Sequence, residues 1–400
     1  MSALSIGRDA IAAIDLEARV ARSLSHVPLD GCVLVAVGKA APAMARGALS
    51  IMAASTQACV VTADGTDARG LDHEPRVTFL RAAHPIPDAR SVVAAEALLS
   101  KARGAPGIVA LISGGASSLA CAPAEGLSLA DKQAVVAAML DAGAPIREVN
   151  LVRRHLSRFK GGGLARMSPH VHTRIVSDVL VERDGLVVPG APHDIGSGPA
   201  SDDPTTAAEA RAALFRFAPG LVALVAGAWI EGRAVVEDEA IVAGPDDLAD
   251  QAARIARNEN AYVTVLPPSL GTVEELAHDW VQRARTMRPS EVILRVAEPS
   301  VALPVTRGRG GRAGRLALSA WALGLPDDVE LACLASDGSD GSSGSAGAVV
   351  RGALAGERLA RAHRALDAYD DAPFLDAEGA SIRGAPSGTN LLDLHVLRRV

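Results

Sequence analysis

Short apolar runs alternate along the chain with longer, Ala-rich segments. The runs have the length of β-strands and no polar face, while the segments between them have the length and periodicity of helices. Strands of continuous apolar character that are separated by helices are typical of a parallel sheet covered on both faces. The runs predict strands at 32–37, 58–63, 107–112, 174–179, 239–244, 261–266, 290–296 and 331–336. The fold class that this pattern predicts is α/β.

The segment 129–142 is a clear predicted helix, because Ser128 is suited to cap it and Asp131 follows three positions later. The stretch 218–235 contains none of the glycine-rich motifs, and a new alternation of strands and helices starts after it. We therefore predict two α/β domains with mainly parallel, Rossmann-like sheets and an interdomain cleft. The N-terminal domain is expected over 1–230 and the C-terminal domain over 231–400.

The composition excludes several classes of protein. Of the 400 residues, 49% are hydrophobic and 22% charged, which is typical of a globular protein. An aromatic content of 2% and a net charge of -6 argue against nucleic acid as a partner. The four cysteines are far apart and form no CxxC pair, so neither a disulfide scaffold nor a zinc site is expected. No run is long and apolar enough for a signal peptide or membrane span, so we expect a cytoplasmic protein without a membrane partner.

Lysine is rare in this chain. Of 40 basic residues only four are lysines, at positions 39, 101, 132 and 160. A lysine that persists where arginine is the usual cation is a candidate for a compact point charge, which the planar guanidinium group cannot imitate. Lys39 and Lys160 each adjoin glycine.

Four of the predicted strands end in, or are followed by, Gly, Ser, Lys or Asp. The segments are Gly38-Lys39, Ser113-Gly114-Gly115, Ser177-Asp178 and Ser336-Asp337. Ligands of open α/β sheets bind where strands end, and glycines let backbone N–H groups approach phosphate oxygens. Glycine-rich turns are common in α/β proteins, so the inference depends on the four together. The chain has neither a Walker A loop nor a GxGxxG fingerprint, which argues against P-loop kinases and Rossmann dehydrogenases.

Eight longer motifs resemble the class II glycerate 2-kinase family, also called the glycerate kinase or MOFRL family and sometimes labelled hydroxypyruvate reductase. They occur in order over nearly the whole chain. The motifs are VLVAVGKAAPAMARGAL, AAHPIPDARS, LISGGASSLACAP, NLVRRHLSRFKGGGLA, DIGSGPASDDPTT, GRGGRAGRLAL, ASDGSDGSSGSAGAVV and GAPSGTNLLDL.

The resemblance implies transfer of the γ-phosphoryl group of ATP to the 2-hydroxyl of D-glycerate, with Mg²⁺, to give 2-phosphoglycerate. Such transfer depends on positioning and charge neutralisation, for which lysines, arginines and backbone amides are suited. The resemblance implies that Lys39, Lys160 and Arg312 are catalytic groups, with Arg312 as a clamp for the substrate carboxylate. As substrate- or phosphate-binding residues it implies Ser113, Gly114, Gly115, Ser117, Ser118, Arg153 and Asn390. Asp178 and Asp337 are the expected metal ligands, because Mg²⁺ prefers carboxylate oxygens.

The chain departs from the family pattern at Ala313, Gly314 and Arg315, where the family usually has Asn-Gln-Glu. This change either alters the substrate specificity of a polar cleft, or it is a neutral change on the surface that leaves Arg315 in solvent. Three alternatives therefore stay open: a kinase of another small hydroxy acid, a catalytically weak ligand-binding relative, and a hydroxypyruvate reductase. The missing dinucleotide fingerprint argues against the third. The expected partners are ATP and the small hydroxy acid, and homodimer formation is left open.

Overall fold

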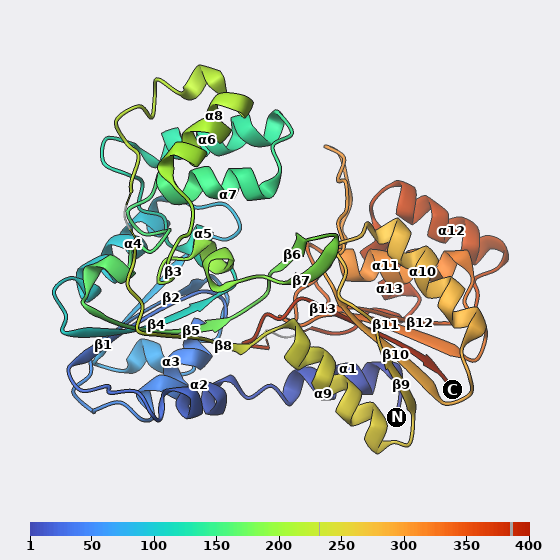
Figure 1. Ribbon diagram of the computed structural model, residues 1–400. Helices are drawn as coiled ribbons and strands as arrows, with labels where there is room; N and C mark the ends of the chain where they lie inside the picture. Colours follow the sequence, from blue (N-terminus) through green and yellow to red (C-terminus); the bar gives the residue numbers. More distant parts are fainter. Residues whose placement is uncertain (232, 385–386) are drawn as a thin grey trace. The chain divides into compact units, whose positions relative to one another are not determined.

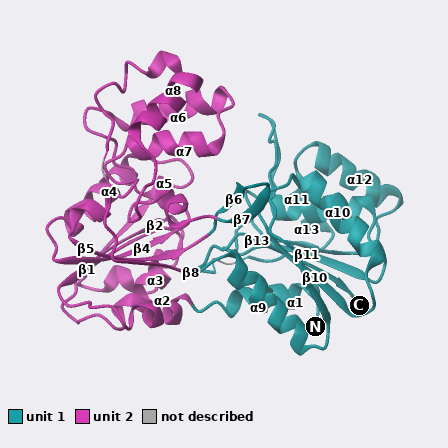
Figure 2. Ribbon diagram, viewed as in Figure 1, with its two compact units in different colours: residues 1–15, 178–189, 243–400 teal, residues 16–177, 190–242 magenta. Residues whose placement is uncertain are grey.

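The computed structural model describes residues 1–231, 233–384 and 387–400 and divides into two compact units (Figure 2). Unit 1 comprises Met1–Asp15, Asp178–Pro189 and Ala243–Val400, and unit 2 comprises Leu16–Ser177 and Gly190–Val242. The boundary expected after residue 230 therefore lies within unit 2. Positions 385 and 386 of the last family motif, and position 232, lie outside the described residues. Each unit contains a sheet and helices, and the predicted α/β class is confirmed.

Unit 2 is built on a six-stranded sheet of order β3-β2-β1-β4-β5-β8. The strands are β1 (Cys32–Val37), β2 (Ala58–Ala63), β3 (Val77–Ala82), β4 (Gly107–Ser113), β5 (His170–Val176) and β8 (Asp238–Ala243). Strand β1 pairs in parallel with both β2 and β4. The chain thus adds strands on one side of β1 up to β3 and then continues with β4 on the other side. This reversal is the topological switch point at which open α/β sheets bind ligands.

Helices cover both faces of this sheet, as the apolar strands require. Figure 1 shows α2 (Leu16–Leu24) and α3 (Ala41–Leu49) on one side and α4 (Ala89–Ala102) on the other. A separate helical layer has its own apolar core, which includes Val135, Val152 and Leu214. Its helices are α6 (Leu129–Asp141), α7 (Ile146–His155) and α8 (Ala207–Phe217). The shorter helices of unit 2 are α5 (Ala116–Leu119), η1 (Leu71–His73), η2 (Ala165–Met167), η3 (Pro192–Ser197) and η4 (Pro219–Leu221).

The predicted cap of α6 is confirmed. The Ser128 hydroxyl accepts a hydrogen bond from the Asp131 backbone N–H at 3.1 Å, and the Asp131 carboxylate accepts one from the Ser128 N–H at 2.9 Å. Two N–H groups that a helix start leaves without partners are satisfied in this way. The helix begins at Leu129 for that reason.

The five-stranded sheet of unit 1 is mixed, whereas the apolar runs predict parallel strands. Its order is β12-β11-β13-β10-β9, and β13 is antiparallel to both of its neighbours. The strands are β9 (Tyr262–Val265), β10 (Glu291–Ala297), β11 (Val329–Ala335), β12 (Gly347–Arg351) and β13 (Asp393–Arg399). Asp393, His395 and Arg398 interrupt the apolar pattern of β13, so the central strand of this sheet has no clear sequence signal.

Helices also lie on both faces of the second sheet (Figure 1). One side carries α1 (Ala3–Ala12) and α9 (Pro245–Asn258), and the other carries α10 (Val273–Thr286) and α11 (Arg312–Leu323). The remaining elements are α12 (Gly356–Asp367), α13 (Asp371–Ala377) and a hairpin of β6 (Leu180–Arg183) and β7 (Leu186–Pro189). None of the described helices is both long and apolar enough to cross a membrane.

Candidate functional site

The loops that follow β1 and β4 meet at the switch point of the unit 2 sheet. The Lys39 backbone N–H donates to the Gly114 carbonyl at 2.9 Å, and the Ala40 N–H donates to the Ser113 hydroxyl at 3.1 Å. Gly38 has φ +134°, and a Cβ atom there would lie 2.0 Å from the Ser113 hydroxyl oxygen. Only glycine permits this approach. Two segments that the sequence predicts to bind phosphate are therefore held together, with the side chain of Lys39 half-buried.

Ser117 connects this loop to two cations. Its hydroxyl accepts from Arg153 Nη2 at 2.6 Å, lies 2.9 Å from Lys160 Nζ, and lies 3.0 Å from the Ser197 hydroxyl. Lys160 also donates to the Ser117 carbonyl oxygen. The Gly161 N–H, which donates to the Ser197 carbonyl at 3.0 Å, fixes the chain beyond Lys160. Ser117, Arg153 and Lys160, all predicted from the sequence, thus lie together.

The cations around Ser117 are buried without acidic partners. Lys160 is 1% exposed and Lys132 is 4% exposed, and the Lys132 ammonium donates to the Leu156 carbonyl at 3.1 Å. Within the described part of the chain, no carboxylate forms an ion pair with Lys132, Arg153 or Lys160. Burial lowers the pKa of Lys132 to about 8 and that of Lys160 well below its ordinary value. Such a cluster is suited to an anionic ligand, which would compensate the positive charge.

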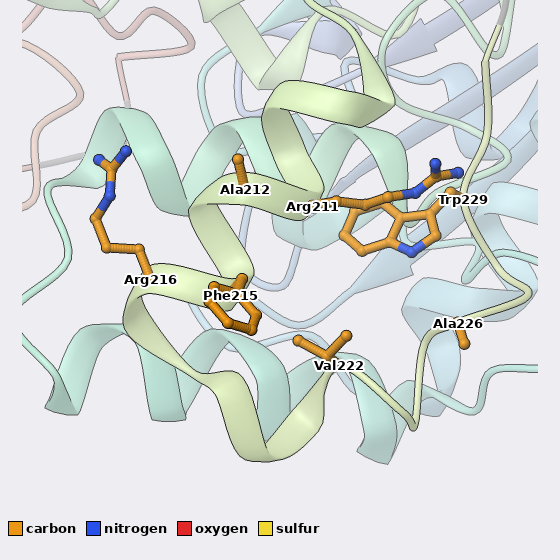
Figure 3. Close-up of a pocket in the computed structure, with 7 residues that line it drawn as sticks. All are labelled: Arg211, Ala212, Phe215, Arg216, Val222, Ala226 and Trp229. Carbon is orange, nitrogen blue, oxygen red and sulfur yellow. The ribbon is translucent and has the colours of Figure 1, made fainter.

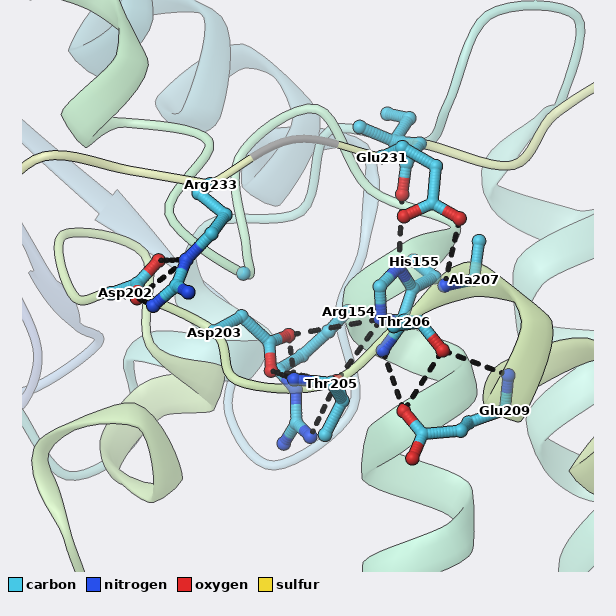
Figure 4. Close-up of polar contacts among 12 residues, drawn as sticks. Arg154, His155, Asp202, Asp203, Thr205, Thr206, Ala207, Glu209, Glu231 and Arg233 are labelled. Atoms are coloured by element: carbon cyan, nitrogen blue, oxygen red, sulfur yellow. Dashed lines mark hydrogen bonds and ion pairs between the residues drawn. The ribbon is translucent and has the colours of Figure 1, made fainter.

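The residues between Arg153 and Lys160 have two different roles, and Figure 4 shows the contacts of Arg154 and His155. Arg154 Nε donates to Asp203 at 2.7 Å, and both side chains are almost fully buried. The His155 ring lies 2.9 Å from the Ile230 carbonyl and 3.0 Å from the Thr205 hydroxyl. These contacts join the end of α7 to the segments around α8. Arg154 and His155 therefore hold the scaffold, while Arg153 and Lys160 contact Ser117.

Ser118, predicted as a further phosphate donor, donates its hydroxyl to the Gly115 carbonyl at 3.1 Å and is 5% exposed. In this arrangement it stabilises the glycine turn. Gly115 itself has φ +85°, a conformation that favours glycine.

The other predicted residues belong to unit 1. The Asn390 amide donates to the Asp178 carboxylate at 2.5 Å, and Asp337 accepts from the Ser339 N–H at 3.0 Å. The Ser336 hydroxyl accepts from the Leu391 N–H at 2.7 Å, which joins the Asp337 turn to the Asn390 segment. No group of three potential metal ligands among His, Cys, Asp and Glu occurs within the described ranges. Mg²⁺ commonly takes one or two carboxylates and completes its shell with phosphate and water oxygens, so Asp178 and Asp337 fit such a role.

Arg312, predicted to clamp a substrate carboxylate, is held by acids of its own unit. Its guanidinium donates to Asp393 at 2.8 and 3.3 Å and to Glu298 at 3.3 Å. Burial lowers the pKa of Arg312, but the charges of Asp393 and Glu298 outweigh this and raise it overall. Three of the five N–H groups of the guanidinium are thus donated within unit 1.

The departure at 313–315 lies inside unit 1, so the idea that Arg315 lies in solvent is wrong. Arg315 is 7% exposed, donates to Asp371 at 3.1 Å and to the Leu366 carbonyl at 2.9 Å, and lies over the Tyr369 ring at 4.0 Å. The N–H groups of Ala313 and Gly314 donate to the Asp340 carboxylate at 3.0 and 2.8 Å. These positions join α11 to α13 and to the turn after β11.

A surface pocket of about 1000 Å³ lies elsewhere on unit 2 (Figure 3). Its lining residues are Arg211, Ala212, Phe215, Arg216, Val222, Ala226 and Trp229. The Arg211 guanidinium lies over the Trp229 ring at 5.6 Å. None of the residues predicted from the sequence lines this pocket, so the switch point defines the candidate site.

Sequence reasoning missed Lys132 and Ser197. Lys132 had a usable signal: it is one of four lysines and occurs three and seven positions before the buried Val135 and Met139 of α6. That spacing places it on the buried face of the helix. Ser197 had no such signal, because its contact with Ser117 depends on the fold.

Comparison with known proteins places the chain in a family. A domain of unknown function, DUF4147, matches residues 2–222, and the MOFRL family matches residues 291–393. A protein of Agrobacterium vitis named "Putative hydroxypyruvate reductase" is 35% identical over 78% of this chain and 73% of its own length. The D-glycerate 2-kinase of Thermotoga maritima is 29% identical over 98% of this chain and 96% of its own.

The solved structures agree with this placement. The crystal structure of glycerate kinase from Thermotoga maritima has a TM-score of 0.82 at 27% identity and covers 100% of this chain and 98% of its own. The fold and the matched regions are those of a two-domain α/β protein with an N-terminal DUF4147 region and a C-terminal MOFRL region. The chain belongs to this glycerate kinase family.

Proposed function

We propose that the protein transfers the γ-phosphoryl group of ATP to the 2-hydroxyl of D-glycerate, giving 2-phosphoglycerate. The observation that carries this proposal is the switch point of unit 2, where Lys39 and the glycine loop adjoin a Ser117 that contacts Arg153 and Lys160. Fixed cations and backbone amides are what phosphoryl transfer needs, because the reaction depends on positioning and on neutralising charge. The names of the Thermotoga maritima relatives support the same reaction.

In the proposed reaction Lys39 stabilises the charge of the transferring phosphoryl group, and the loop from Ser113 to Gly115 holds phosphate oxygens. The Arg153 guanidinium, which donates to Ser117, compensates the charge of the anionic substrate. Asp178 and Asp337 would hold Mg²⁺, which when bound neutralises phosphate charge. Asn390 orients Asp178 through the 2.5 Å hydrogen bond. The two N–H groups of the Arg312 guanidinium that do not donate to Asp393 or Glu298 would bind the substrate carboxylate.

The test is an assay of the full chain with ATP, Mg²⁺ and D-glycerate, run beside NADH and NADPH oxidation with hydroxypyruvate. We expect ADP and 2-phosphoglycerate in equal amounts and no oxidation of either nicotinamide. Reduction of hydroxypyruvate without ADP formation would refute the proposal. Phosphorylation of another 2-hydroxy acid in preference to D-glycerate would keep the kinase and change its substrate.

A second experiment, the Mg²⁺ dependence of activity, tests the proposed roles of Asp178 and Asp337. Asp337→Asn should raise the Mg²⁺ concentration needed for half-maximal activity while leaving the unfolding midpoint nearly unchanged, because one charged ligand is lost. An unchanged Mg²⁺ requirement would move the assignment to Asp178 alone.

A further inference from the structure

Ser117 is more exposed than the Lys160 side chain to which it is hydrogen-bonded. Lys160 is 1% exposed, whereas Ser117 is half-buried. A ligand at the glycine loop can therefore touch the Ser117 hydroxyl but not the Lys160 amine behind it. Any proton that Lys160 exchanges with a ligand has to pass through Ser117.

The hydrogen-bond inventory permits such an exchange. Arg153 can only donate, so it occupies one lone pair of the Ser117 oxygen at 2.6 Å. A neutral Lys160 has two N–H groups and one lone pair. One N–H can donate to the Ser117 carbonyl, and the lone pair can accept the Ser117 hydroxyl proton across 2.9 Å. Before substrate binds, the Ser197 hydroxyl at 3.0 Å can donate to the second lone pair of Ser117, and the substrate hydroxyl takes its place as donor when it binds.

The surroundings of Lys160 favour its neutral form. Burial has the largest effect on its pKa, and the charges of Arg153 on α7 and Lys132 on α6 lower it further. The Cys121 thiol, which follows α5, opposes this effect. No carboxylate among the described residues pairs with Lys160 to restore the ammonium form.

We propose that Ser117 is a catalytic residue that relays the proton of the substrate 2-hydroxyl to Lys160, which acts as a positioning residue and proton acceptor behind it. This inference rests on the proposed kinase function and specifies how its acceptor hydroxyl is activated.

The relay conserves atoms and charge. The substrate O–H proton moves to the Ser117 oxygen while the Ser117 proton moves to Lys160 Nζ, so Ser117 remains a neutral hydroxyl. The substrate oxygen forms a bond to the γ-phosphorus, and the bond from that phosphorus to the bridging oxygen of ADP breaks. Lys160 ends as an ammonium ion, which balances the negative charge that has moved onto the product. It returns the proton through Ser117 to water after product release.

Four variants test the relay in steady-state kinetics with ATP, Mg²⁺ and D-glycerate. Ser117→Ala should lower kcat on the order of 10²-fold, a typical contribution of general base catalysis, with KM changed only a few-fold. Ser117→Thr keeps the hydroxyl and should retain most of the activity. Lys160→Met and Lys160→Arg should both lose the rise of kcat with pH that the neutral amine gives the wild type. Ser168→Ala and Lys101→Met, which alter a hydroxyl and a lysine elsewhere in unit 2, are the controls.

Several results would overturn the relay. One is a Ser117→Ala variant whose KM rises while kcat stays unchanged, because the hydroxyl would then only bind. Another is a Lys160→Arg variant that keeps both wild-type activity and its pH profile. A phosphorylated Ser117 found by intact mass after incubation with ATP alone would make this residue a nucleophile instead.

A measurement without turnover separates this inference from the proposed function. The free energy of unfolding is compared between the wild type and Lys160→Met as pH rises from neutral toward the ordinary pKa of lysine. A neutral Lys160 in the native state makes the unfolded state bind more protons, so the wild type should gain stability relative to the variant. A constant difference overturns the relay. If D-glycerate is not phosphorylated, the proposed function fails, while this comparison still decides whether Lys160 is a proton acceptor.

Discussion

At the scale of single residues, the scarcity of lysine is the most informative feature of this sequence. It singles out Lys39 and Lys160, and the structure places them on segments that meet Ser113 and Ser117 respectively. It could also have singled out Lys132, which is buried beside the same group. The sequence alone does not show that Arg153, Lys160 and Ser197 all contact the Ser117 hydroxyl, because only the fold brings these residues together.

Lys39→Ala should abolish or nearly abolish phosphoryl transfer and leave the fold intact. The loss of one charge beside the transferring phosphoryl group should cost several kcal/mol, roughly 10²–10³-fold in kcat. Lys39→Arg should recover little, because the guanidinium group is larger and planar. Measuring kcat and the circular dichroism spectrum checks this, with Lys101→Ala as control. Near wild-type kcat in a folded Lys39→Ala variant would exclude a catalytic role for Lys39.

Lys132 should make stability depend on pH. Its pKa is about 8 in the folded protein against an ordinary value of 10.5, so the unfolded chain binds the proton more tightly between these values. The folded state is penalised below pH 8, and the penalty disappears as pH rises toward 10.5. Relative to Lys132→Met, the wild type should therefore gain about 3 kcal/mol over this range. Urea unfolding of both proteins across that range checks the prediction, and parallel stability curves would contradict it.

At the scale of elements, the apolar runs located five of the six strands of the unit 2 sheet but missed β3, and they located β9, β10 and β11 of the mixed sheet but missed β12 and β13. Predicted and observed bounds agree for β1 and β2, whose residues are nearly all buried. Strand β5 was expected at 174–179 but spans His170–Val176, because its first half contains polar side chains that are buried. Strand β13 was missed for the same reason. A pattern of hydrophobicity cannot identify a strand whose polar side chains are satisfied by partners from distant elements.

The contact of Arg315 with α13 gives a test at this scale. Arg315→Met leaves the carboxylate of Asp371, which is 2% exposed, without its cation and should destabilise the protein by about 3–5 kcal/mol. Burial raises the pKa of Asp371 to about 6 although Arg315 opposes this. In an Asp371→Asn background, the Arg315→Met substitution should therefore cost less stability. The double variant Arg315→Met/Asp371→Asn should therefore lose less than Arg315→Met alone.

Denaturant unfolding measures these differences. The matched control is Arg364→Met on α12, whose partner Glu357 is exposed, and it should change stability by less than about 1 kcal/mol. If Arg315→Met is as mild as this control, the contact of Arg315 with Asp371 does not hold α11 to α13. The same result would reopen the possibility that positions 313–315 set the substrate preference.

At the scale of the whole molecule, the chain does not divide at a single point. The first fifteen residues belong to unit 1 with the residues after 242, although unit 2 separates them in sequence. Residues 1–24 have the periodicity of helices, but an amphipathic helix can cover any sheet of suitable width. Specific contacts assign the first helix to unit 1. The Ala3 N–H donates to Glu330 at 3.1 Å, and α1 packs on α9, β11 and β13.

Gly7 provides the test of this discontinuous unit. A Cβ atom at Gly7 would lie 2.7 Å from a methyl carbon of Leu334 in β11, which is 1% exposed. Gly7→Leu should therefore force α1 away from the sheet and destabilise unit 1 by about 1–3 kcal/mol, even though leucine is the better helix former. Hydrogen exchange should show faster exchange in α9, β11 and β13, while β1 and β4 of unit 2 keep their protection. Arg8→Leu, at the exposed neighbouring position, should change none of these rates. Faster exchange in β1 and β4 with unchanged β11 and β13 would instead assign the first helix to unit 2.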